Sequence, residues 1–130
     1  MSVDRVAVTD AAAALLRELR QAHGQPLMFH QSGGCCDGSS PMCYVQGTFV
    51  TGAADILLGT LDAGLPEPLP VWISKAQFEY WSHTHITIDV VKGRGAGFSI
   101  EGPTGNRFIT RSRVFSDEET ADLAPVRTGP

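Results

Sequence analysis

Glycine and proline interrupt the apolar runs of this chain, and this limits the length of the elements it can form. The 130 residues include 14 glycines and 8 prolines, the strongest breakers of helices and strands. One amphipathic helix is expected over 10–23, because apolar side chains from Ala12 to Ala22 recur at i, i+3, i+4 and i+7. Thr9 is a suitable N-cap, and Gly24 provides the C-terminal stop.

After this helix, the sequence predicts short strands with one short helix among them. Residues 27–31 and 85–91 alternate their side chains with the period of a strand. Ser74 is a suitable N-cap for a short helix over 75–83. Further strands are expected at 43–50, 55–61, 71–73, 98–101 and 107–115, the last two as a hairpin. The connections are too short for a parallel α/β sheet, so the predicted class is α+β, dominated by β.

Residues 31–44, QSGGCCDGSSPMCY, contain all three cysteines of the chain, Cys35, Cys36 and Cys43. Three glycines and a proline favour a shaped loop here, and three thiols on one loop indicate soft-metal ligation or thiol chemistry. The metal would be iron, zinc or copper, or an iron–sulfur cluster. Alternatively, buried cysteines fill space in the core, or one thiol is a nucleophile beside a base.

Four other side chains are candidate additional ligands for such a metal. Asp37 lies within the loop, and His30 precedes Cys35 by five residues. His83 and His85 form an H-x-H pair, which would point both rings to one side if both residues were on a strand. The alternative for His30 is a surface or hydrogen-bonded strand histidine. For the H-x-H pair it is a pair of polar surface residues.

Three arginines alternate along the predicted strand 107–115: Arg107, Arg111 and Arg113. Charged side chains on an edge strand block further strand pairing, and guanidinium groups can also bind the carboxylates of a partner. The same side chains are therefore candidates for a partner-binding surface.

The charge and hydropathy of the chain exclude several classes of protein. A net charge of −4 gives no general reason to bind nucleic acid or an anionic membrane. No apolar run approaches the roughly 20 residues that span a bilayer, and MSVDRVAVTD lacks the apolar core of a signal peptide. We therefore expect a cytoplasmic protein with reduced thiols. Its domain is expected over 1–115 and a flexible tail over 116–130. The sequence is compatible with a homo-oligomer.

Four segments together resemble a small bacterial family of unknown function. They are HQSGGCCDGSSPMCY, AQFEYWSHTHITIDVV, GRGAGFSIEGPTGNRF and TRSRVF, and the resemblance covers about residues 6–115. Members of that family are typically encoded beside NAD-dependent acetaldehyde or aldehyde dehydrogenases. The resemblance implies an accessory role toward such a dehydrogenase. Our leading hypothesis is a non-enzymatic protein with the cysteine loop as its working part.

A more distant resemblance is to the HesB-like A-type iron–sulfur carriers. The order VAVTDAAAALLRELR, a strand, a Gly-Cys loop, VWISKAQFEYWSHTHITIDVV and GFSIEGP is similar to their layout. It implies a compact mixed β-sandwich or pseudobarrel with an N-terminal helix and one short internal helix. Cys35 stands where that family has its first ligand, but the family's C-terminal Cys-Gly-Cys is replaced by GPTGNRF. A free-standing metal or iron–sulfur protein and a thiol-dependent enzyme acting on aldehydes remain the alternative functions.

Overall fold

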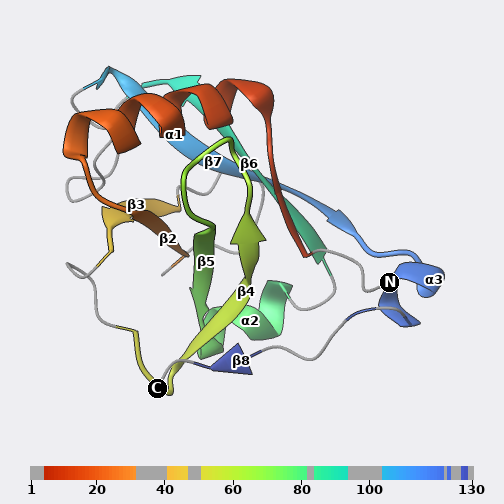
Figure 1. Cartoon of the computed structure of the whole chain (residues 1–130). Helices are drawn as coiled ribbons and strands as arrows, with labels where there is room; N and C mark the ends of the chain where they lie inside the picture. Colours follow the sequence, from red (N-terminus) through yellow and green to blue (C-terminus); the bar gives the residue numbers. More distant parts are fainter. Residues whose placement is uncertain are drawn as a thin grey trace.

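A computed structural model of the chain describes residues 5–31, 41–46, 51–81, 84–93, 104–121, 123 and 127–128. These residues form two mixed β-sheets and three helices, so the protein is a β-dominated α+β structure. In Figure 1 the long β6–β7 pair passes behind helix α1, and the short helix α2 lies lower in the view, beside β4 and β5. Within the described residues, no helix combines the length and apolarity needed to cross a membrane.

Helix α1 (Asp10–His23) has the caps that the sequence predicts. The Thr9 hydroxyl accepts a hydrogen bond from the Ala12 amide at 3.2 Å, which satisfies one of the amides at the helix start. Gly24 ends the helix with φ of 66°, a left-handed conformation that costs glycine little because it has no Cβ. The apolar face of α1 is buried, with Leu16 fully covered.

The larger sheet has the strand order β3-β2-β5-β4-β8. Strands β2 and β5 pair in parallel, and the other neighbours pair in antiparallel. The bounds are β2 (Leu27–Gln31), β3 (Met42–Val45), β4 (Asp55–Leu61), β5 (Leu69–Ser74) and β8 (Arg127–Thr128). Helix α2 (Lys75–Trp81) follows β5 directly, and the Ser74 hydroxyl caps it by accepting from the Gln77 amide at 3.3 Å.

The smaller sheet has the order β1-β6-β7. Strand β1 (Val6–Val8) pairs in parallel with β6 (Thr84–Lys92), which pairs in antiparallel with β7 (Asn106–Val114). Ile86 and Ile88 point from β6 into the core and are 2% and 1% exposed. Because side chains alternate along a strand, His85 and Thr87 belong to the outer face of this sheet.

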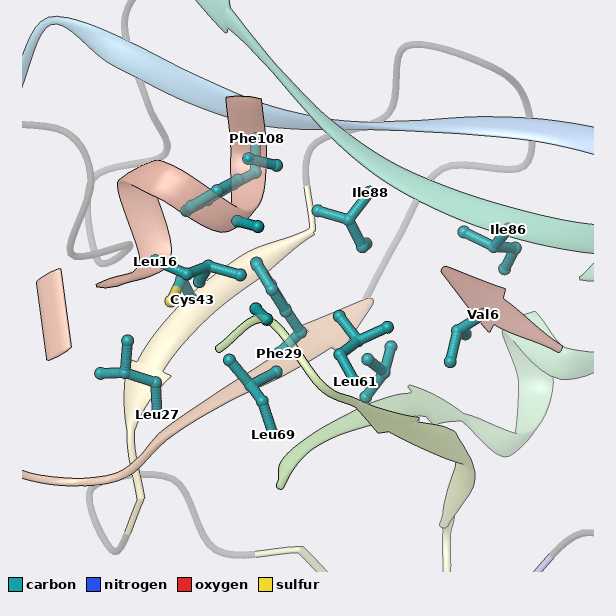
Figure 2. Close-up of a cluster of buried hydrophobic side chains, with 14 of the residues drawn as sticks. Val6, Leu16, Leu27, Phe29, Cys43, Leu61, Leu69, Ile86, Ile88 and Phe108 are labelled. Atoms are coloured by element: carbon teal, nitrogen blue, oxygen red, sulfur yellow. The ribbon is translucent and has the colours of Figure 1, made fainter. Parts of the chain in front are cut away.

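The core joins the two sheets and α1. Phe29 of β2 meets Phe108 of β7 edge to face, with ring centroids 4.9 Å apart and planes at 89°. Figure 2 shows these rings among side chains from both sheets and from α1. The sheets also approach where β4 carries Gly59, since a Cβ at this position would lie 3.0 Å from Val6 Cγ2.

The parallel pairs and three short elements differ from the sequence-based expectation. Strands β1 and β6, like β2 and β5, are far apart in the chain, so the length of a local connection does not restrict their pairing. Neither β1 nor β8 shows enough apolar alternation to be predicted. Helix α3 (Asp117–Ala121) and β8 also fall within 116–130, the range expected to be a flexible tail. The expected partner strand 98–101 lies outside the described residues, whereas β7 pairs with β6.

Candidate functional site

The cysteine loop connects β2 and β3, which form an antiparallel pair with His30 opposite Met42 and Phe29 opposite Cys43. This pairing places the two ends of the loop side by side. Cys35, Cys36 and Asp37 lie outside the described residues, as does His83. The structure therefore locates only the base of the loop, with His30 on one strand and Cys43 on the other.

Cys43 is fully buried. Its exposed fraction is 0%, and it belongs to the apolar core together with Leu16 and Phe29. Figure 2 shows its sulfur beside Leu16. Because residues directly opposite in an antiparallel pair share a face, Cys43 points to the same side of the sheet as Phe29. The thiol thus faces the centre of the protein, as in the core-filling alternative.

His30 is also buried, with 3% exposed, but it points to the other face of the sheet. Its Nε2 lies 2.7 Å from Asp55 Oδ1 at the start of β4, and Asp55 Oδ2 accepts from the Gly52 amide at 3.0 Å. A carboxylate only accepts, so Nε2 is the donor of this contact. Burial acts to raise the pKa of Asp55, but the hydrogen bonds from His30 and Gly52 and the attraction of His30 outweigh it and hold the pKa below its ordinary value.

The candidate ligands that the structure describes, His30, Cys43 and His85, do not converge on one point. His30 and Cys43 occupy opposite faces of the larger sheet, whereas His85 lies on the smaller sheet with its ring edge to face against Phe115, 6.1 Å between centroids. In the described part of the chain, no three His, Cys, Asp or Glu side chains are grouped to hold a metal ion. These residues therefore do not fit a metal or cluster by themselves.

The partner-binding candidate Arg111 is held on the outer face of the smaller sheet. It donates its Nε to Asp89 Oδ2 at 2.7 Å, while Asp89 Oδ1 accepts from the Thr9 hydroxyl and the Val90 amide, each at 2.8 Å. The hydrogen bond from Arg111 is the main reason that the pKa of Asp89 is lowered. The network links β7 to β6 and to the N-terminus of α1.

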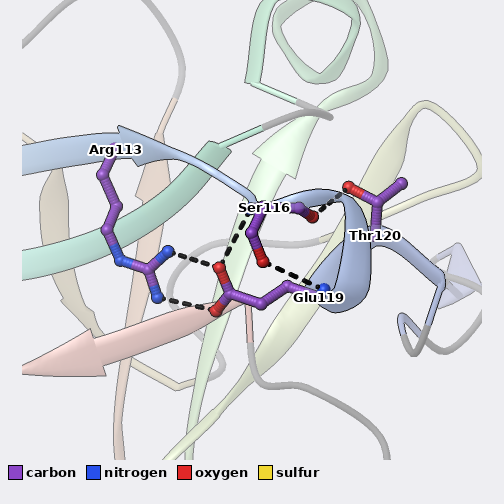
Figure 3. Close-up of polar contacts among 4 residues, drawn as sticks. All are labelled: Arg113, Ser116, Glu119 and Thr120. Atoms are coloured by element: carbon purple, nitrogen blue, oxygen red, sulfur yellow. Dashed lines mark hydrogen bonds and ion pairs between the residues drawn. The ribbon is translucent and has the colours of Figure 1, made fainter.

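Arg113 forms a different contact, in which both terminal nitrogens donate to one carboxylate. They reach the two oxygens of Glu119 at 2.7 and 2.8 Å (Figure 3). Glu119 also accepts from the Ser116 amide, and the Ser116 hydroxyl accepts from the Glu119 amide. This is a capping box at the start of α3. The bonds from Arg113, then that from the Ser116 amide, lower the pKa of Glu119 to about 2.

Arg107 lies near the turn end of β7, where a Cβ on Gly93 would contact its Cδ at 3.7 Å. It makes no ion pair with any of the residues that the structure describes. A cavity of about 240 Å³ lies farther along the same sheet, at the opposing pairs His85–Arg113 and Thr87–Arg111. It is lined by His85, Thr87, Arg111, Ser112 and Arg113, and we call it the β6–β7 groove.

Three carboxylates that organise these contacts were not predicted from the sequence. Asp55 is 25 residues from His30, and no local pattern connects the two. Asp89 follows the strand alternation but becomes a candidate only when β7 is known to lie opposite it. Glu119 had a usable signal, because Ser116 and Glu119 form the S-x-x-E spacing of a capping box.

Comparison with known protein families identifies a matching family model. A family model described as a domain of unknown function, DUF779, matches residues 15–114. No curated protein and no solved structure matches the chain. The matched range contains the cysteine loop, the β2–β3 pair and all of β7.

Proposed function

We propose that this chain, which belongs to the DUF779 family, is a non-enzymatic accessory protein of an NAD-dependent aldehyde dehydrogenase. The resemblance to proteins encoded beside such enzymes motivates the partner. The cysteine loop would be the working part, and the outer-face arginines of β7 would be a secondary contact. The HesB-like relationship of the fold is part of this proposal.

The burial of Cys43 is the observation that most favours a shared site. With 0% exposed and its side chain in the core, this thiol is not available at the surface. Cys35 and Cys36 then remain as the thiols of the loop. Two thiolates fall short of the four ligands of a typical structural zinc site. The remaining ligands would come from the other candidates of this chain, such as Asp37 and His83, or, as we propose, from a partner such as the catalytic thiol of a dehydrogenase.

The experiment is a binding assay between this protein and a purified NAD-dependent aldehyde dehydrogenase from the same organism. We expect a complex in size-exclusion chromatography that is lost in the Cys35→Ser/Cys36→Ser double variant. The matched control is Cys43→Ala, which alters a core thiol and should retain the complex if the variant remains folded. A wild-type protein that forms no complex would refute the proposal.

The second candidate is a free-standing metal or iron–sulfur binding protein. The observation in its favour is the β2–β3 pair, which places the two ends of the cysteine loop side by side, so that thiols of one loop can approach one ion. Anaerobic purification followed by metal analysis tests it. Stoichiometric metal that is lost in the Cys35→Ser/Cys36→Ser double variant would support this candidate, and a metal-free protein would remove it.

A further inference from the structure

The β6–β7 groove carries exposed positive charge on an otherwise acidic protein. The side chains of Arg111 and Arg113 are 57% and 55% exposed, although the net charge of the chain is −4. The two groove arginines are matched by two carboxylates, Asp89 and Glu119, and Arg107 adds a positive charge on the same face but outside the groove. An anion bound here would therefore be attracted by local contacts, since the overall charge repels it.

The two groove arginines use different sides of their guanidinium groups. Arg113 places both terminal nitrogens on Glu119, in the bidentate arrangement that suits a carboxylate. Arg111 binds Asp89 through Nε alone. Among the described residues, its two Nη groups donate to no acceptor, so the fork that Arg113 uses is still available on Arg111.

The available fork of Arg111 is also held in place. Asp89 fixes the Nε side of the guanidinium and is itself held by the Thr9 hydroxyl and the Val90 amide. A guanidinium that is already oriented loses less rotamer freedom when it binds an anion. Thr87 lies directly opposite Arg111, and its hydroxyl adds a neutral donor to the groove.

We propose that the β6–β7 groove binds a carboxylate side chain from an acidic segment of a partner protein, with the Nη fork of Arg111 as its anchor. A volume of about 240 Å³ is below the roughly 300–1,000 Å³ of sites that enclose small ligands, and it suits one side chain of a bound segment. The inference rests on the proposed function for the identity of the partner. The carboxylate site itself is independent of that identity.

The test measures binding of a fluorescent peptide of alternating Gly and Glu by anisotropy at low ionic strength, with a Gly and Gln peptide as the neutral control. We expect only the Glu peptide to bind. Arg111→Gln should weaken binding about tenfold, the loss of hydrogen bonds to one charged group. Arg107→Gln is the matched control, because it makes the same charge change on the same strand outside the groove, and we expect less than about a twofold effect.

A second pair of variants changes the charge in the opposite direction. Glu119→Gln weakens the hold on Arg113 but retains the capping box, since glutamine also serves at this position. It should tighten peptide binding about two- to fivefold. Glu118→Gln makes the same charge change one residue away, without a contact to Arg113, and should change binding less. Arg111→Lys keeps the charge but removes the fork, and should bind more weakly than the wild-type protein.

Equal weakening by Arg111→Gln and Arg107→Gln would overturn the proposal, because general charge would then explain binding. A folded wild-type protein that does not bind the Glu peptide would also overturn it. The dehydrogenase is absent from these measurements. A peptide that binds at Arg111 while no dehydrogenase complex forms would therefore support the groove and refute the proposed function, and the reverse result would refute only the groove.

Discussion

The hydrogen bonds of Asp55 provide a quantitative test of how the base of the cysteine loop is stabilised. Asp55→Asn keeps the shape of the side chain but leaves one oxygen where there were two. An amide can therefore accept from His30 or from Gly52, but not from both in the observed arrangement. The Asp55 side chain is only 16% exposed, so water replaces the lost bond poorly.

We expect Asp55→Asn to lower the free energy of unfolding by about 2 kcal/mol, the value of one hydrogen bond to a charged group. The total stability of a domain of this size is roughly 5–15 kcal/mol, so the change is readily measured. Urea unfolding followed by tryptophan fluorescence is a suitable assay, because Trp72 lies beside His30 in the parallel register. The matched control is Asp62→Asn, where an exposed side chain accepts from Gly64 at 3.2 Å, with an expected change within about 0.5 kcal/mol.

The difference between Asp55→Asn and the wild-type protein should also depend on pH. The folded pKa of Asp55 lies below its unfolded value near 3.8. Its contribution is therefore complete above the unfolded pKa and is lost as the pH falls through the folded pKa. The measured difference should shrink when the assay is repeated at about pH 3. A cost below about 0.5 kcal/mol near neutrality, or an equal cost at both pH values, would refute this account of the pair.

Three further predictions concern the core, the α3 contact and the end of α1. Phe108→Ala removes the ring that packs against Phe29 and should cost about 3–5 kcal/mol in urea unfolding. Glu119 should titrate near 2 in carboxyl NMR, and Arg113→Gln should raise this pKa toward the ordinary 4.5, because its largest cause is removed. Gly24→Ala should cost about 1 kcal/mol in thermal unfolding, since φ is 66° and a Cβ there contacts nothing within 4 Å.

Each of these predictions has an outcome that contradicts it. A Phe108→Ala protein within about 1 kcal/mol of wild type would mean that the two sheets do not meet at this ring. A Glu119 pKa near 4.5 would show that Glu119 does not accept the hydrogen bonds from Arg113. An unchanged or higher melting temperature for Gly24→Ala would show that the left-handed helix end does not restrict this position.

Local patterns were sufficient for the larger elements of the fold. Helix α1 and strand β4 have the bounds that periodicity, caps and turn residues predict, 10–23 and 55–61. Strand β1 has three residues and β8 has two, which is too few for a period to be visible. The parallel pairs were not predictable for another reason, since each brings together strands separated by at least two other elements.

The candidate site was less predictable because its contacts are distant in sequence. The sequence identifies His30 as a ligand or a hydrogen-bonded strand residue, and the structure shows a hydrogen bond to Asp55. The choice depends on where β4 begins relative to β2, which no local pattern determines. For Cys43, the deciding fact is its position opposite Phe29. A residue opposite a core phenylalanine is itself directed to the core.

Because Cys43 is completely buried, the rate at which its thiol is alkylated measures how often the protein opens. An alkylating reagent can reach its sulfur only after the β2–β3 pair has separated from the core, so the labelling rate reports the frequency of that opening. In a variant with serine at positions 35 and 36, Cys43 would be the only thiol of the chain. Its labelling would then follow opening events in the native protein without denaturant, dye or isotope exchange.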